Sequence, residues 1–266
     1  MLFPTISANA ITVDSEGNVI LLESEQGILV KMLQAWGFDS TVSIGGLGNR
    51  SEAFLHPVEA HQKNRQTLYI LDDVERRVVL LDKQLQITGQ IDFLSLNIAP
   101  NSTNEIASDL IPVSCDVTVT GEMMILNQAD NRVISLNTAG AVNNTFGGLD
   151  YGAGSLSEPV ELRIDVRNNV YVSDTVEQLI HVFDIFGVYQ FDLEPQTTFR
   201  WNRFRIYDRL LICFTEDQLH LEDLVSGSTK NLKIPEGFTL RDVALNRDFL
   251  YLLFGNSVHL HRRNRN

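Results

Sequence analysis

The feature that most constrains this chain is a fixed set of intervals that recurs along it. Gly45 is followed after twelve residues by Pro57, and further intervals of fifteen and ten residues lead to Asp72 and Asp82. The intervals recur in two more segments, marked by Gly147, Pro159, Asp174 and Asp184, and by Pro112, Asn127 and Asn137. A fixed period of this length indicates a repeat architecture in which each repeat is one supersecondary unit.

Each repeat has the pattern of several short strands. Apolar runs rich in β-branched and aromatic residues alternate with Asp, Asn and Gly, which is typical of strands joined by tight turns. Weaker copies at the start, and near the end at 210–214 and 250–254, bring the count to six. Small sheets of this kind lose most of their free edges when they stack radially. The sequence therefore predicts an all-β fold, a six-bladed β-propeller with four-stranded antiparallel blades.

The ends of the chain bear on how this propeller closes. The last repeat, 239–262, has room for three strands, and we expect residues 2–6 to supply the fourth and close the ring. We expect one domain over residues 1–266, with an insertion loop at about 94–108 that is rich in Asn, Ser and Pro.

The fourth repeat carries a resemblance to a known family. Its segments 146–148 (FGG), 158–165 (EPVELRID), 169–175 (NVYVSDT) and 181–184 (HVFD) resemble an NHL repeat. The resemblance is specific over residues 45–190 and loose outside them. The family's polar turn carries Asn-x-Arg, and the fourth repeat has Gln178-Leu179-Ile180 there instead, so the arginine is lost. It implies a propeller that binds ligands on its top face, where the first strand of each blade begins.

Composition narrows the partner classes. The formal net charge of -13 argues against nucleic acid and anionic membranes as partners. No apolar run approaches the roughly 18 residues that membrane insertion needs. Cys115 and Cys213 lie in apolar runs and are expected to be buried thiols. The N-terminus lacks the features of a secretory signal, so we expect a cytoplasmic protein or, as the NHL resemblance favours, a cell-envelope protein whose signal has been removed.

The position two residues after the marker proline is a candidate binding site at the top face. It holds Glu59, Glu161 and Asp242 in three of the repeats, and His56 directly precedes a marker proline. One interpretation is an acidic funnel that accepts a cation, an amine or a basic peptide. The structural alternative, which we favour, is that the acids pair with nearby arginines, among them Arg163, Arg203 and Arg241.

The fifth repeat opens with alternating aromatic and basic residues. Exposed Trp and Arg are frequent at interface hot spots, so this segment is a candidate partner site; alternatively, its aromatic side chains pack between blades. The candidate residues here are Arg200, Trp201, Asn202 and Arg203.

The sequence favours a binding or scaffold protein over an enzyme. The six histidines do not occupy equivalent positions at the top of neighbouring repeats, so we predict no zinc site, and no nucleophile motif is present. We therefore expect no catalytic residues and no cofactor, with a protein or peptide as partner and a glycan as second choice. The alternative is a divalent-metal-dependent lactonase- or lyase-like enzyme, in which Glu59, Glu161, Asn202 and Asp242 would hold calcium at the channel mouth.

Overall fold

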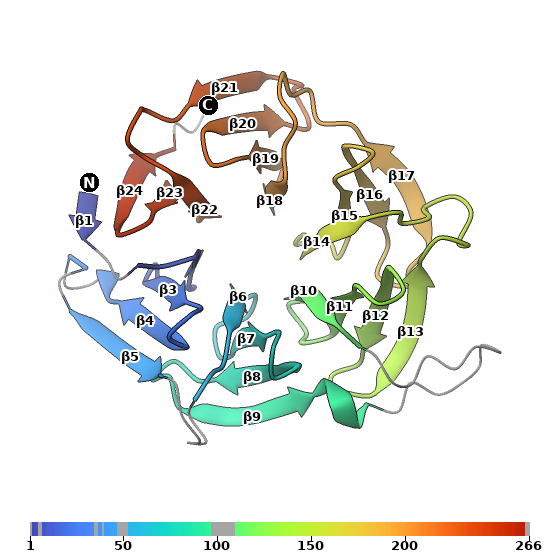
Figure 1. The fold of residues 1–266 in the computed structure, drawn as a ribbon, viewed down its shortest axis with the longest axis horizontal. Helices are drawn as coiled ribbons and strands as arrows, with labels where there is room; N and C mark the ends of the chain where they lie inside the picture. The colour runs from blue at the N-terminus through green and yellow to red at the C-terminus, as the bar shows by residue number, and fades with distance from the viewer. Residues whose placement is uncertain are drawn as a thin grey trace. The chain divides into compact units, whose positions relative to one another are not determined.

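The described part of the protein is built mainly from strands. The computed structural model describes residues 2–4, 7–34, 37–38, 40–46, 53–96 and 110–263. Within them the strands form six four-stranded antiparallel sheets; η2 (Phe93–Ser95) is a 3-10 turn, and there is no α-helix. The predicted fold class, an all-β six-bladed β-propeller with four-stranded antiparallel blades, is confirmed (Figure 1).

The chain divides into two compact units, each holding three blades. Unit 1 comprises residues 1–91 and 234–266. Its strands, in order across each sheet, are β2 (Ala10–Val13), β3 (Val19–Glu23), β4 (Ile28–Met32) and β5 (Thr41–Gly45) in blade 1; β6 (Pro57–His61), β7 (Leu68–Asp72), β8 (Arg77–Leu81) and β9 (Ile87–Asp92) in blade 2; β22 (Leu240–Leu245), β23 (Phe249–Phe254), β24 (Ser257–Arg262) and β1 (Leu2–Pro4) in blade 6.

Unit 2 comprises residues 92–233. Its strands, in the same order, are β10 (Pro112–Val117), β11 (Met123–Asn127), β12 (Arg132–Leu136) and β13 (Val142–Gly147) in blade 3; β14 (Pro159–Ile164), β15 (Val170–Asp174), β16 (Leu179–Phe183) and β17 (Tyr189–Leu193) in blade 4; β18 (Arg203–Tyr207), β19 (Leu210–Phe214), β20 (Gln218–Asp223) and β21 (Thr229–Lys233) in blade 5.

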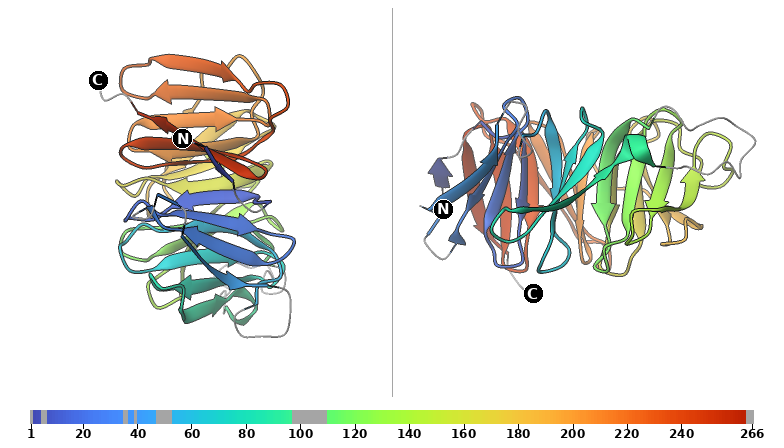
Figure 2. Two further views of the ribbon diagram at one scale, coloured as in Figure 1. Left: turned by 90° about the vertical axis from the view of Figure 1, so that its left-hand side faces the viewer. Right: turned by 90° about the horizontal axis from the view of Figure 1, so that it is seen from below.

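The N-terminal strand completes the last blade. β1 pairs antiparallel with β24, with Leu2 opposite His259 and Pro4 opposite Ser257. Figure 2 shows the blue N-terminal strand beside the red C-terminal strands. β1 is the edge strand of its sheet, the kind of strand in which proline is tolerated. The predicted fourth strand from the N-terminal segment is confirmed for residues 2–4; residues 5 and 6 of the predicted segment 2–6 lie outside the described residues.

The repeated intervals have a direct structural cause. The interval of fifteen places the marker proline opposite the polar mark across the first two strands, as Pro159 lies opposite Asp174. The Asp174 carboxylate then accepts hydrogen bonds from the backbone N–H groups of Ser157 and Glu158, each at 2.9 Å. Equivalent contacts join Asp72 to Leu55 and His56, and Asn127 to Ile111. The polar mark therefore caps the chain as it enters each first strand.

The hydrophobic cores lie between neighbouring blades. In unit 2, Met124 and Phe146 of blade 3 pack with Val172 and Phe183 of blade 4, and the two phenylalanine rings lie 5.0 Å apart. In unit 1, buried residues of blades 1 and 2 form a matching cluster that includes Ile20, Leu22, Ile70 and Val79. Full burial of one such side chain contributes about 1.5–3 kcal/mol, so contact between blades stabilises each unit.

Two expectations about the chain as a whole remain predictions. They are the single domain over residues 1–266 and the insertion loop at about 94–108, of which 97–108 lie outside the described residues. Cys115 and Cys213 are buried free thiols, as expected. No helix in the described part of the chain is long and apolar enough to cross a membrane.

Deleting residues 1–6 should lower the thermal stability sharply, because it removes β1 and leaves the β24 edge without a partner. Differential scanning calorimetry of the deletion variant measures this. A matched control removes residues 264–266, which follow β24. Equal melting temperatures for the two truncations would contradict the role given to β1.

Candidate functional site

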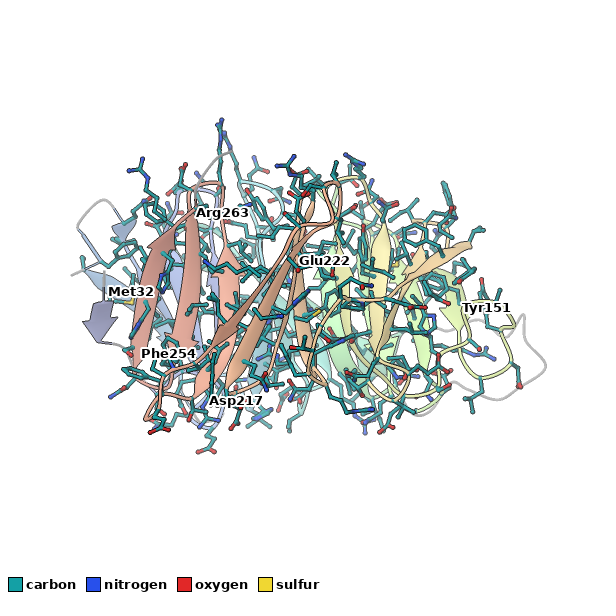
Figure 3. The ribbon with its side chains drawn as sticks, turned by 90° about the horizontal axis from the view of Figure 1, so that it is seen from above. Met32, Tyr151, Asp217, Glu222, Phe254 and Arg263 are labelled. Carbon is teal, nitrogen blue, oxygen red and sulfur yellow. The ribbon has the colours of Figure 1, made fainter. Side chains whose placement is uncertain are left out.

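The candidate site lies at the top end of the blades, where each first strand begins and where the turn between the second and third strands lies. In blade 5 this turn contains Asp217, which is exposed, whereas Glu222 lies further along β20 and is buried. The two side chains occupy different heights along the blade (Figure 3).

A β-bulge sets the direction of the side chain two residues after the marker proline. The register between the first and second strands shifts between Pro159 and Glu161 in blade 4, and between Pro112 and Ser114 in blade 3. A bulge leaves one residue unpaired and turns the following side chain. The shift recurs in unit 1 before Glu59 and before Asp242.

The redirected side chain bonds to the first strand of the next blade. In unit 2, Glu161 Oε2 accepts the Phe204 N–H at 2.8 Å, and Ser114 Oγ accepts the Leu162 N–H at 3.0 Å. In unit 1, Asp242 Oδ2 accepts the Ile11 N–H at 3.0 Å. We call this contact the inter-blade bridge. It gives a structural role to the position that the sequence singled out for ligand binding.

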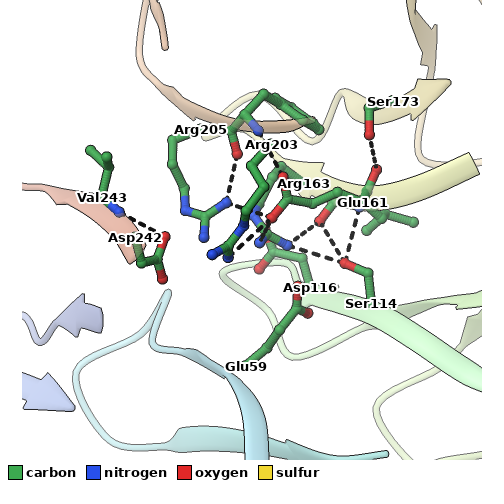
Figure 4. A network of polar contacts seen from close by, with 12 residues as sticks. Glu59, Ser114, Asp116, Glu161, Arg163, Ser173, Arg203, Arg205, Asp242 and Val243 are labelled. Atoms are coloured by element: carbon green, nitrogen blue, oxygen red, sulfur yellow. Dashed lines mark hydrogen bonds and ion pairs between the residues drawn. The ribbon is translucent and has the colours of Figure 1, made fainter. Parts of the chain in front are cut away.

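Glu161 also lies at the centre of an arginine cluster in unit 2. Its Oε1 atom lies 2.5 Å from Arg163 Nη2, 2.5 Å from Arg205 Nη1 and 3.7 Å from Arg203 Nη2. Figure 4 shows the three guanidinium groups converging on this carboxylate. The Phe214 ring lies 5.4 Å from the Arg203 guanidinium carbon and 5.6 Å from that of Arg205, within cation–π range.

These contacts leave little of the Glu161 carboxylate for a ligand. Glu161 and Arg163 are each 5% exposed, and both carboxylate oxygens have partners. This is the arginine pairing that the structural alternative expects, with Arg205 added. Burial and the carboxylates of Glu222 and Glu161 raise the pKa of the neighbouring Cys213 thiol well above its usual range, so that sulfur stays protonated and is a poor nucleophile.

The segment 199–205 packs between blades more than it faces solvent. Trp201 is 2% exposed, lies in a core cluster with Phe204, and exchanges hydrogen bonds with the Gln178 side chain. Arg200 is exposed and donates to the Thr175 carbonyl at 3.0 Å. Asn202 is also exposed, and its N–H donates to the Phe214 carbonyl at 3.4 Å. Arg200 is therefore at the surface, whereas its neighbour Trp201 is buried.

The remaining candidate residues belong to unit 1. Asp242 is 1% exposed and also accepts the Val243 N–H. Glu59 is buried, with one carboxylate oxygen 3.3 Å from His61 Nε2. His56 is 40% exposed, and its Nδ1 lies 2.8 Å from Asp73. His56 is thus the more accessible of these candidates.

Sequence reasoning missed four residues. Asp116 accepts the Ile164 N–H at 2.8 Å in a second contact between blades 3 and 4, and its charge inside an apolar strand was the available signal. Arg205 belongs to the Glu161 cluster but was not a candidate. His181 and His220 occupy equivalent third-strand positions, opposite Val172 and Cys213; these positions lie inside the third strands rather than at the top of the repeats.

Comparison with known proteins adds information on the fold only. No family model and no curated protein sequence matches the chain. Among solved structures, virginiamycin B lyase from Staphylococcus aureus aligns at 11% identity with a TM-score of 0.61, over 100% of this chain and 89% of that one. A streptogramin B lyase aligns at 11% identity with a TM-score of 0.62, over 100% of this chain and 88% of that one. A chain of the mitotic checkpoint complex aligns at 8% identity with a TM-score of 0.63, over 100% of this chain and 91% of that one. At these identities the likeness establishes the propeller fold alone.

Replacing Glu161 with alanine should lower the free energy of unfolding by about 3–5 kcal/mol, because it breaks a buried ion pair and leaves the Phe204 N–H unsatisfied. Urea denaturation measures the change. Glu158→Ala, two residues from the bulge and exposed, serves as the control and should change stability by about 0.5 kcal/mol or less. Similar small effects for both variants would contradict the structural role of Glu161.

Proposed function

We propose that this chain is a non-catalytic binding propeller that recognises a protein or peptide, with a glycan as second choice, at the top end of its blades. The observation that carries the proposal is the state of Glu161. A catalytic or metal-binding carboxylate needs an oxygen directed at a ligand, whereas both oxygens of Glu161 bond to protein groups.

The exposed groups at the top end of unit 2 favour a basic partner. Glu158, Glu177, Glu216 and Asp217 are exposed on its loops and turns, and Val176 is 56% exposed beside Glu177. An exposed carboxylate next to an exposed apolar side chain, as at Glu177 and Val176, suits a segment that carries Lys or Arg next to an apolar residue. The overall charge of -13 would speed the approach of such a segment.

Membership of the NHL-repeat family is part of this proposal. The resemblance over residues 45–190 supports it, and the Asp174 cap gives a physical reason for the aspartate that the repeat pattern carries. The family's use of its top face for ligands agrees with the exposed carboxylates of unit 2.

The second candidate function is a divalent-metal-dependent lyase- or lactonase-like enzyme. The likeness in fold to virginiamycin B lyase favours it. Its proposed calcium ligands are Glu59 and Asp242 in unit 1, and Glu161 and Asn202 in unit 2. Their convergence on one ion stays a prediction, and the contacts of Glu161 and Asp242 within their own units weigh against it.

Selection from a displayed random peptide library should enrich peptides rich in Lys and Arg. Reversing two top-end charges, with Glu158→Lys and Glu216→Lys together, should weaken binding of a selected peptide about tenfold, and added salt should weaken it further. Glu122→Lys, in the turn between β10 and β11 at the other end of blade 3, is the control and should leave the affinity unchanged.

Two results would overturn the proposal. One is selection of acidic peptides, or of basic peptides whose binding the double variant leaves unchanged. The other is a stoichiometric calcium ion that raises the melting temperature and is lost in Glu161→Gln, which would favour the enzyme.

A further inference from the structure

A second cluster of ionisable side chains lies on blade 4, away from the Glu161 cluster. His181 of β16 is 4% exposed, and its Nδ1 lies 2.7 Å from Asp192 of β17, the residue opposite it in the sheet. The other ring nitrogen, Nε2, is buried and has no hydrogen-bond partner among the described residues. A buried ring nitrogen without a partner is costly, so its surroundings bear on what it binds.

A carboxylate faces this nitrogen beyond hydrogen-bond range. Oε2 of Glu177 lies 3.8 Å from His181 Nε2, which is too long for a hydrogen bond. The second oxygen of Glu177 accepts a hydrogen bond from the Ser157 hydroxyl at 3.2 Å. The Glu177 side chain is 42% exposed, so its carboxylate is accessible from solvent, whereas His181 Nε2 itself is buried.

We propose that Glu177 and His181 form a binding site for a zinc-type transition-metal ion, with Asp192 as a positioning residue. A neutral histidine that donates Nδ1–H to Asp192 keeps its lone pair on Nε2, the arrangement common in protein zinc sites. Zinc binds nitrogen and carboxylate oxygen at about 2.0–2.2 Å, so two such atoms 3.8 Å apart can share one ion. Water would fill the remaining positions.

The equivalent histidine of blade 5 has hydrogen-bond partners that His181 lacks. His220 bonds through Nδ1 to Asn231 at 2.6 Å, and its Nε2 lies 3.3 Å from Glu222. Both of its nitrogens have partners, and the position of Glu222 corresponds in blade 4 to Phe183. His259 also has an Nε2 atom without a partner among the described residues, but the aromatic rings of Phe238 and Phe254 pack against it.

The same geometry excludes calcium as the preferred occupant. Calcium takes six to eight oxygen ligands and does not use imidazole, whereas imidazole with carboxylate suits zinc. The site also lies within blade 4, so it does not depend on the residues of the calcium-dependent enzyme alternative.

Two measurements on the intact protein test the proposed zinc site. Isothermal titration calorimetry with zinc chloride measures the affinity, and anomalous scattering from zinc-soaked crystals locates the ion. We expect one zinc ion beside His181 Nε2. Glu177→Gln should abolish its binding, and Asp192→Asn should weaken it about 10- to 100-fold. Because Glu177 is partly exposed, its variant should fold normally. His56→Gln, which alters a histidine that also pairs with an aspartate but has an exposed ring, is the control and should bind zinc as the wild type does.

Three outcomes would overturn the inference. They are no zinc binding by the wild-type protein, an anomalous peak only at other histidines, and Glu177→Gln with unchanged affinity. Loss of zinc in His56→Gln with retention in Glu177→Gln would assign the ion to His56 instead.

Discussion

The free edge of each blade's first strand is the constraint on which this architecture depends. A first strand has a hydrogen-bonded neighbour on one side only, so alternate N–H groups face away from the sheet. A buried N–H without a partner costs about 1–3 kcal/mol. The inter-blade bridge meets this need with one side chain, as Glu161 does for Phe204 and Asp242 does for Ile11. Because the bridge joins neighbouring blades, it also fixes their first strands to each other.

The bridge explains why acids occur two residues after the marker proline, the position predicted as a ligand site. One oxygen of the carboxylate accepts the N–H. In a buried setting the other oxygen needs a cation or a further hydrogen-bond donor. At Glu161 it meets Arg163 and Arg205, and at Asp242 it meets the Val243 N–H. Ser114, at the same position in blade 3, bridges without charge. The buried carboxylates of the first strands therefore have structural partners, and the proposed ligand recognition rests on the exposed carboxylates of the turns.

The sequence predicted the fold because its repeated marks are themselves structural contacts. Asp174 recurs in the repeat pattern because it caps the start of the first strand. Pro159 recurs because it lies at the β-bulge. The candidate site was harder to predict, because a residue type does not reveal its partner. Trp201 and Arg200 are adjacent in sequence, yet the first is buried and the second exposed. The environment of His181 depends on Asp192, eleven residues away and across a strand pair, and no interval in the sequence indicated it.

Amide hydrogen exchange of the native protein, followed by NMR, tests the inter-blade bridge most directly. The account predicts that the amides of Ile11, Leu162 and Phe204 exchange as slowly as the amides inside the sheets, because each donates to a buried side chain. Exchange of these three amides at the rates of exposed turn residues, with the sheets still protected, would contradict it.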